Sequence, residues 1–134
     1  LSVEVKKRTP LPVNNFKNRF NSLNNELTNY IKNLGNKNIV IWGAGHQSLA
    51  IISLSGIAKY ISYIVDSANF KQNKYTSGTN IKIESPEQLK TNEPDAVIII
   101  AAGYSDEVRK IISSKYSFIK NIAIVREDHL EIIQ

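Results

Sequence analysis

The sequence predicts an α/β fold, a three-layer, doubly wound and mostly parallel sheet preceded by a long N-terminal helix. In residues 38–66 an apolar strand, a two-glycine turn, a helix and a second apolar strand follow one another. A continuous apolar run over residues 95–101 is typical of a central parallel strand covered on both faces. Alternation of strands with helices implies right-handed crossovers between parallel strands.

The elements are expected in a regular order. The helix over residues 14–34 has an apolar stripe at three- and four-residue steps, which includes Phe16, Phe20, Leu23 and Leu27, and ends at Gly35. Further helices are expected at residues 46–55 and through Val108 to Tyr116, and a closing helical turn at residues 128–134. The strands are expected at residues 38–42, 60–66, 81–83, 95–101 and 121–125.

The chain is expected to hold one domain over residues 14–134, with residues 1–13 as a linker. Its 134 residues with 42% hydrophobic content suffice for a single core. Thr9-Pro10-Leu11-Pro12 favours an extended lead-in, because proline fixes its own φ and disfavours the α region for its predecessor. The chain starts with Leu1 and contains no methionine, so we expect a piece of a longer protein.

The two-glycine turn after the first strand is typical of a Rossmann-like fold and indicates a candidate nucleotide cleft. Gly43 permits the tight turn, and Gly45 allows a phosphate to approach the backbone at the following helix N-terminus, where His46 stands. Asp66 ends the second strand, where such folds place the carboxylate that holds ribose hydroxyls. Ser48 occupies the place of a third glycine, which disfavours dinucleotide binding.

Each of these residues also has a structural interpretation. Gly43 and Gly45 can serve close packing of helix on strand, His46 can be solvated, and Asp66 can cap the turn that follows it. Because ligands bind outside the carboxyl ends of parallel strands, we expect these turns to meet the turn at residues 102–104 in one cleft.

Composition excludes several function classes. The absence of cysteine excludes thiolate metal sites, and the adjacent Glu127, Asp128 and His129 diverge in direction, so no metal site is expected. The formal charge of +5 comes mostly from scattered lysines, which predicts a solvated surface and no nucleic-acid partner. With neither a membrane-length apolar run nor a signal-peptide pattern, we expect no membrane partner and a cytoplasmic location.

Five segments carry a family resemblance: residues 42–45, 65–66, 70–83, 94–95 and 101–107, of which the most specific part is Lys71-Gln72-Asn73-Lys74-Tyr75-Thr76-Ser77-Gly78-Thr79. Together they resemble the C-terminal domain of bacterial sugar C-methyltransferases that depend on S-adenosylmethionine. The chain departs from the family pattern at Ser48, Ser77, Asn80 and Ala102-Gly103, and the last change puts an inherited sugar contact at that turn in doubt.

The resemblance implies a parent enzyme with a zinc-binding N-terminal domain and a middle domain that binds S-adenosylmethionine. This domain would then help to frame a nucleotide-sugar cleft, with Lys71, Lys74, Tyr75 and Tyr104 as the substrate-binding candidates. It would hold no cofactor and no catalytic residue, and would be inactive alone. Methylation at carbon needs a base, which no constellation of this chain supplies. The alternatives are an NAD(P)- or nucleotide-sugar-binding module of a polysaccharide-biosynthesis enzyme, and a purely structural domain.

Overall fold

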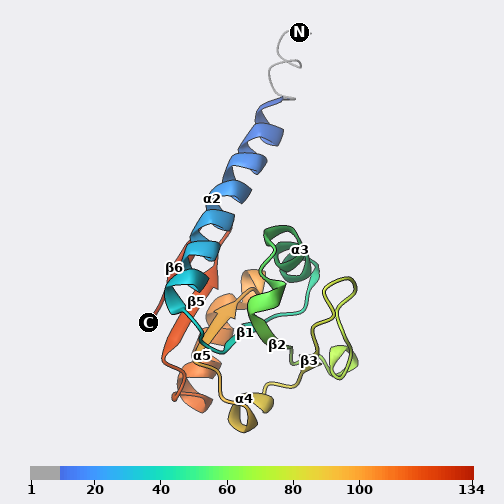
Figure 1. Cartoon of the computed structure of the whole chain (residues 1–134), viewed down its shortest axis with the longest axis vertical. Helices are drawn as coiled ribbons and strands as arrows, with labels where there is room; N and C mark the ends of the chain where they lie inside the picture. Colours follow the sequence, from blue (N-terminus) through green and yellow to red (C-terminus); the bar gives the residue numbers. More distant parts are fainter. Residues whose placement is uncertain (1–9) are drawn as a thin grey trace.

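The computed structural model describes residues 10–134, with side chains at position 18 and from position 20 onward. Residues 1–9 of the linker expected over residues 1–13 lie outside this part of the chain. Figure 1 shows a twisted sheet from which one helix, α2, extends toward the N-terminal end.

A single six-stranded sheet in the order β3-β2-β1-β4-β5-β6 forms the centre of the molecule. All neighbouring pairs are parallel except β5 and β6. The strands are β1 (Ile39–Trp42), β2 (Ile61–Val65), β3 (Ile83–Glu84), β4 (Ala96–Ile99), β5 (Asn121–Val125) and β6 (Leu130–Ile132). Strand order reverses between β1 and β4, so the carboxyl ends of these two strands flank the switch point of a doubly wound sheet.

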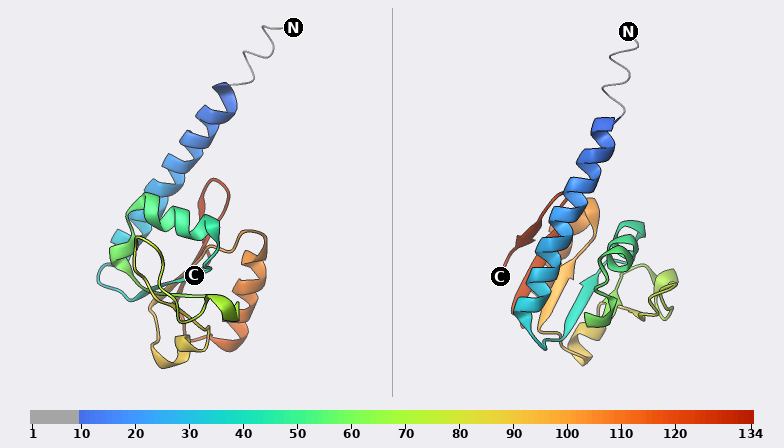
Figure 2. Two further views of the ribbon diagram at one scale, coloured as in Figure 1. Left: turned by 90° about the vertical axis from the view of Figure 1, so that its right-hand side faces the viewer. Right: turned by 45° about the horizontal axis from the view of Figure 1, so that its top comes forward.

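Helices cover both faces of the sheet, as Figure 2 shows for α2 and α3 on one side and α5 on the other. Their bounds are α2 (Pro10–Leu34), α3 (His46–Ser55), α4 (Gln88–Thr91) and α5 (Ser105–Lys115). Alternate residues of each strand enter separate cores: Ile41 and Ile98 contribute to the core beneath α2 and α3, whereas Trp42 and Ile99 contribute to the core beneath α4 and α5. The predicted fold class, a mostly parallel Rossmann-like α/β sheet in three layers, is confirmed.

Two stretches differ from the sequence expectation. Pro10 and Pro12 lie in the first turn of α2 and not in an extended lead-in, since the first N–H groups of a helix have no intrahelical acceptor and their loss costs nothing there. The expected closing helical turn over residues 128–134 is wrong: Leu130–Ile132 forms β6, antiparallel to β5, with Leu130 opposite Val125. Short edge strands of this kind are common on otherwise parallel sheets.

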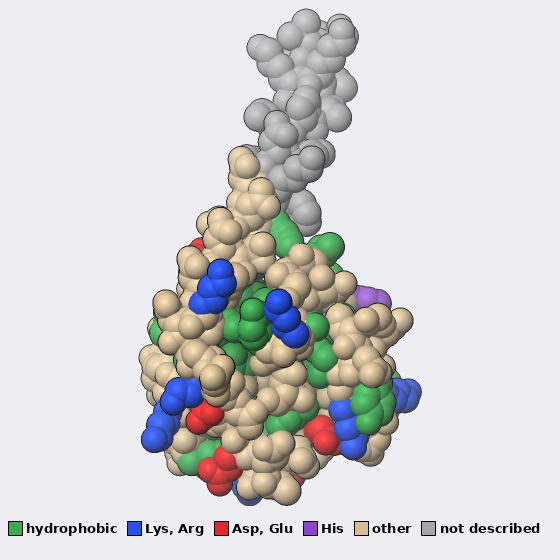
Figure 3. Space-filling view, in the orientation of Figure 1, with side chains coloured by type: hydrophobic (Ala, Val, Ile, Leu, Met, Phe, Trp, Pro, Cys, Tyr) green, Lys and Arg blue, Asp and Glu red, His purple; other side chains and the backbone are tan. Residues whose placement is uncertain are grey.

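The C-terminal half of α2 packs on the domain through Leu23, Leu27 and Ile31, which are buried, while its N-terminal half extends beyond the sheet in every view. Among residues 10–134, no helix has the length and apolarity needed to cross a membrane. On the face drawn in Figure 3, basic side chains are spread singly with acidic ones between them.

Candidate functional site

A cleft of about 410 Å³ opens at the carboxyl ends of β1, β2 and β4. The turn after β1, the end of β2, the 3₁₀ turn after β4 and the start of α5 contribute its walls. Its lining includes Gly43, Gly45, His46, Ser48, Asp66, Lys71 and Tyr104. Three turns far apart in the sequence are thus brought to one place, as the parallel sheet requires.

The two glycines of the first turn have different structural roles. A Cβ on Gly43 would lie 2.1 Å from the carbonyl oxygen of Ile100, and its φ of +129° is one that side-chain-bearing residues rarely adopt. Close approach of β1 to β4 therefore requires glycine at position 43. Gly45 has no atom within 4 Å of a Cβ position and ordinary backbone angles. Packing therefore does not require glycine at position 45, which lies in the lining of the cleft.

Asp66 is hydrogen-bonded to two backbone N–H groups. Its Oδ2 accepts from the N–H of Ala44 at 2.8 Å, and its Oδ1 accepts from the N–H of Ala68 at 2.9 Å. The Nζ of Lys71 lies 3.9 Å from Oδ2. The carboxylate therefore caps the turn after β2, one of the two expected roles, and also fastens it to the glycine turn.

The first turn of α3 faces the cleft without a side-chain cap, because its N-cap residue is Gly45. His46 is exposed at the first helical position. The Ser48 side chain is only 1% exposed, and its hydroxyl has no hydrogen-bond partner among the described residues. Sequence reasoning noted Ser48 only as a missing glycine, since burial of its hydroxyl is set by the packing of α3.

The loop with the most family-specific sequence divides into two parts. Lys71 lines the cleft, with its Nζ 5.7 Å from the centre of the exposed Phe70 ring. Lys74 and Tyr75 are exposed and do not line it. Their backbone pairs with residues 82–83, the carbonyl of Lys74 accepting from the N–H of Ile83 at 2.8 Å.

The tip of that loop is held from inside by Thr76. Its Oγ1 accepts a hydrogen bond from the N–H of Ile81 at 2.8 Å, and contacts the hydroxyl of Thr79. Thr76 is buried, whereas its neighbour Tyr75 is 61% exposed. The segment with the most family-specific sequence therefore also has a structural role, because it forms a self-contained turn.

The third wall of the cleft comes from the 3₁₀ turn Ala102–Tyr104 and the start of α5. Tyr104 is 71% exposed and is one of the residues that line the cleft. Ser105, the first residue of α5, is 1% exposed and its hydroxyl also lacks a partner among the described residues. Ser105 does not line the cleft, so the two unpaired serines differ in their access to a ligand.

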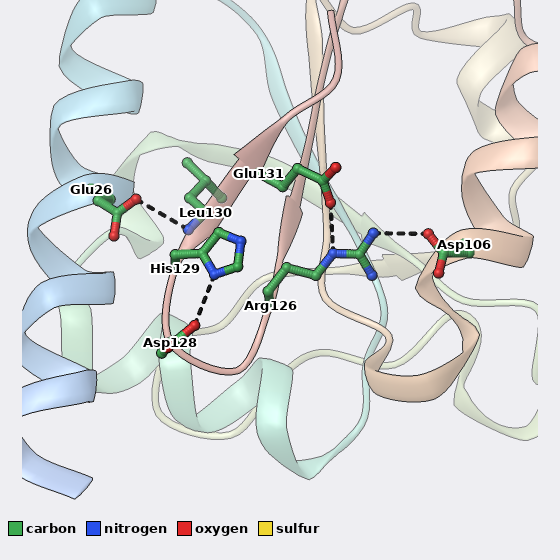
Figure 4. Close-up of polar contacts among 7 residues, drawn as sticks. All are labelled: Glu26, Asp106, Arg126, Asp128, His129, Leu130 and Glu131. Atoms are coloured by element: carbon green, nitrogen blue, oxygen red, sulfur yellow. Dashed lines mark hydrogen bonds and ion pairs between the residues drawn. The ribbon is translucent and has the colours of Figure 1, made fainter. Parts of the chain in front are cut away.

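Arg126, which follows β5 at the same edge, is held by two acids. Its Nε donates to Glu131 and its Nη2 donates to Asp106, both at 2.8 Å, as drawn in Figure 4. The hydrogen bond from Arg126, followed by its charge, lowers the pKa of the Asp106 carboxyl. Asp106 thus joins α5 to the β5–β6 hairpin. The sequence alone does not indicate this contact, because the two residues lie twenty positions apart.

The same close-up shows the side chains of the hairpin near α2. Nδ1 of His129 lies 2.8 Å from Oδ1 of Asp128, and the N–H of Leu130 donates to Glu26 of α2 at 3.3 Å. In the part of the chain that the structure describes, no group of three or more His, Cys, Asp or Glu residues is placed to hold a metal ion.

The sequence of the chain matches a known family. A model of the C-methyltransferase C-terminal domain matches residues 3–130. The chain belongs to this family. The resemblance expected from the sequence is confirmed, and the C-methyltransferase C-terminal domain implies further domains in a larger parent methyltransferase.

The fold of this C-methyltransferase C-terminal domain is also found in a nucleotide-sugar enzyme. The crystal structure of UDP-D-quinovosamine 4-dehydrogenase from Vibrio fischeri is similar, with a TM-score of 0.56 and 17% sequence identity. The likeness covers 73% of this chain and 93% of that chain, and at this identity it concerns the fold alone. No curated protein is similar enough in sequence to match the chain.

Proposed function

We propose that the domain serves a C-methyltransferase that transfers a methyl group from S-adenosylmethionine to a carbon of a nucleotide-linked keto sugar. Its part is to frame the nucleotide-sugar cleft. The observation that carries the proposal is the convergence of Gly43, Gly45, Asp66, Lys71 and Tyr104 on one open cleft, in a chain of this family.

The chemistry of the cleft suits binding better than catalysis. Lys71 supplies a positive charge that can bind a phosphate. Tyr104 supplies an exposed aromatic ring that can pack against a flat or apolar face of a ligand. Carbon methylation requires a base to generate a carbanion next to the ketone. We assign that base, and the S-adenosylmethionine site, to the preceding domains of the parent, so the isolated domain is inactive.

Lys74 and Tyr75 have a peripheral place in this proposal. They are exposed beyond the cleft, on the loop that Lys71 begins. From there they can contact the part of a nucleotide sugar that extends out of the cleft, or the neighbouring domain of the parent.

Steady-state kinetics of the parent enzyme test the proposal. Lys71→Ala together with Tyr104→Ala should raise the KM for the nucleotide sugar about tenfold, because the loss of one hydrogen bond to a charged group usually weakens binding by about that factor. The KM for S-adenosylmethionine should stay unchanged. Lys59→Ala with Tyr60→Ala is a matched control, since it also removes one lysine and one tyrosine, both exposed and outside the cleft lining. Equal effects of both pairs on the sugar KM would contradict the proposal.

A further inference from the structure

The segment between Asp66 and Asn73 carries Lys71 to the cleft and is held at both ends by β3. The N–H of Asp66 donates to the carbonyl of Glu84 at 3.1 Å, and the N–H of Asn73 donates to the carbonyl of Ile83 at 2.7 Å. Asn73 has a φ of 65°, in the left-handed region that asparagine tolerates better than most residues, so the chain turns there. Because both ends are fixed, the course of the chain between them decides where Lys71 lies.

The side chain of Gln72 closes this segment with a hydrogen bond. Its Nε2 donates to the backbone carbonyl of Asp66 at 2.8 Å, across six positions of the chain. Inside the closed segment, the N–H of Lys71 donates to the carbonyl of Ala68 at 3.0 Å, and the N–H of Gln72 donates to the carbonyl of Asn69 at 3.2 Å. The glutamine amide thus fastens the end of this 3₁₀ turn to the residue that ends β2.

The closed segment determines the position of the Lys71 ammonium group. A lysine has a long flexible stem, which loses much rotamer freedom when its charged end is held in one place. Here Nζ of Lys71 lies 3.9 Å from Oδ2 of Asp66, the residue to which Gln72 is bonded. Gln72 itself is not among the residues that line the cleft. It can therefore act on a ligand in the cleft only through its neighbour.

The contact depends on the donor group of the glutamine. A glutamate at position 72 would have nearly the same shape but no N–H, and its carboxylate would face the carbonyl oxygen of Asp66 and repel it. A methionine would have a similar length and would lack the donor without introducing a charge. These two substitutions therefore remove the same hydrogen bond with and without electrostatic repulsion.

We propose that Gln72 is a positioning residue for the nucleotide sugar, and that it keeps the Lys71 ammonium group in the cleft by holding the carbonyl of Asp66. The inference rests on the proposed function, in which Lys71 contacts the ligand, and deepens it by naming the side chain that sets the place of that contact.

A double-mutant cycle in the parent enzyme tests the inference. Gln72→Glu should raise the KM for the nucleotide sugar about threefold and Lys71→Ala about fivefold, with kcat and the KM for S-adenosylmethionine unchanged. Both changes together should raise the sugar KM no further than Lys71→Ala alone, because Gln72 acts through this lysine. Effects that multiply to about fifteenfold would overturn the positioning role.

Gln134→Glu is the matched control. Nε2 of Gln134 donates to the backbone carbonyl of Ile119 at 2.9 Å, which is the same kind of contact, and Gln134 lies outside the cleft lining. This variant should keep the sugar KM of the unmodified enzyme, and a rise equal to that of Gln72→Glu would contradict a specific role of Gln72. If Gln72→Glu does not fold, Gln72→Met replaces it in the cycle.

Amide hydrogen exchange of the 134-residue chain tests the closure of the segment without a ligand. Gln72→Glu should speed the exchange of the Lys71 and Gln72 amides about tenfold, because the 3₁₀ turn opens more often once its end is released. Gln134→Glu should leave the exchange of both amides unchanged. Exchange that Gln72→Glu does not speed would overturn the inference, since the segment would then be closed without the glutamine amide.

The two experiments separate this inference from the proposed function. If Lys71→Ala with Tyr104→Ala raises the sugar KM while Gln72→Glu changes neither that KM nor the exchange, the positioning role falls and the proposed function stands. If Gln72→Glu speeds the exchange while the Lys71 and Tyr104 variant keeps the sugar KM unchanged, the proposed function falls and the positioning of Lys71 by Gln72 stands.

Discussion

The carboxylate of Asp66 accepts a hydrogen bond from the backbone N–H of Ala44 at 2.8 Å, and so ties the end of β2 to the glycine turn after β1. The two residues are 22 positions apart in sequence. One side chain therefore sets the shape of the cleft floor, whether or not it also contacts a ligand. Substitution of Asp66 therefore tests how much this contact stabilises the turn.

Asp66→Ala should lower the free energy of unfolding by about 1–3 kcal/mol, because it leaves the N–H of the buried Ala44 without an acceptor. Chemical denaturation measures the loss. Asp95→Ala is the control, since Asp95 caps the N–H of Asn38 at 2.8 Å in an exposed setting, where water can replace the carboxylate. A cost for Asp66→Ala no larger than for Asp95→Ala would mean that the turn is formed without this contact.

The two glycines of the turn should respond differently to alanine. Gly43→Ala should cost about 3 kcal/mol or more, since it combines a forbidden φ with a Cβ placed 2.1 Å from a backbone oxygen. Gly45→Ala should change stability by less than about 1 kcal/mol, because its surroundings are open and its angles ordinary. Thermal melting of both variants decides the matter, and similar melting temperatures would be incompatible with the close approach of β1 and β4.

Burial on both faces makes β4 sensitive to substitution. Ile99 is fully buried against α5, so Ile99→Ala should cost about 2–5 kcal/mol. Ile132 in the edge strand β6 is 63% exposed, and Ile132→Ala should stay within about 0.5 kcal/mol of the parent. Urea denaturation of the two variants gives both numbers. An Ile99 variant as stable as the Ile132 variant would show that β4 is not the centre of the core.

The domain should lose stability in alkaline solution between about pH 10 and 12. Burial, together with the charge of Glu84, raises the pKa of Tyr63 to about 12. Burial and the hydrogen bond to Glu87 do the same for Tyr116, whose pKa is also about 12. In this interval the folded phenols keep protons that the unfolded ones, with a pKa of 10.0, have lost, so the free energy of unfolding falls as pH rises.

Single phenylalanine substitutions check this pH dependence. Tyr63→Phe and Tyr116→Phe each remove one titrating group, so each should make the decline of unfolding free energy with pH shallower. Denaturation series at about pH 9, 10 and 11 suffice to measure the slope of unfolding free energy against pH. A slope that neither substitution changes would exclude the two tyrosines as its origin.

The fold was predictable because its signals are local. Apolar runs, the glycines Gly35 and Gly43, and the stripe of α2 each lie within one segment, and the parallel topology follows from the alternation of strands and helices. The antiparallel strand β6 was missed, since residues 130–132 are too few for a period to distinguish strand from helix. Its pairing depends on β5 and on Glu26 of α2, which only the folded chain brings near.

The candidate site was predictable to a smaller extent. The sequence indicated the glycine turn and Asp66, because the carboxyl ends of parallel strands must meet, and the family resemblance indicated Lys71 and Tyr104. It could not indicate that Lys74 and Tyr75 do not line the cleft, nor that the hydroxyl of Ser48 is buried with no partner among the described residues. Both facts depend on side-chain packing between elements, which produces no periodic pattern in the sequence.

The loop over residues 71–83 allows stability and binding to be separated. Thr76→Val keeps the volume of the side chain but removes the acceptor of the Ile81 N–H, so it should cost about 1–3 kcal/mol in unfolding free energy. Lys74→Ala with Tyr75→Ala changes exposed side chains only, and should move that free energy by about 0.5 kcal/mol or less per residue. In the parent enzyme the same pair should raise the sugar KM less than Lys71→Ala with Tyr104→Ala does, because those two residues line the cleft. An unchanged sugar KM combined with a collapsed melting temperature in the Lys74 and Tyr75 variant would instead make the loop a structural lid, and these two residues would lose their place at the ligand.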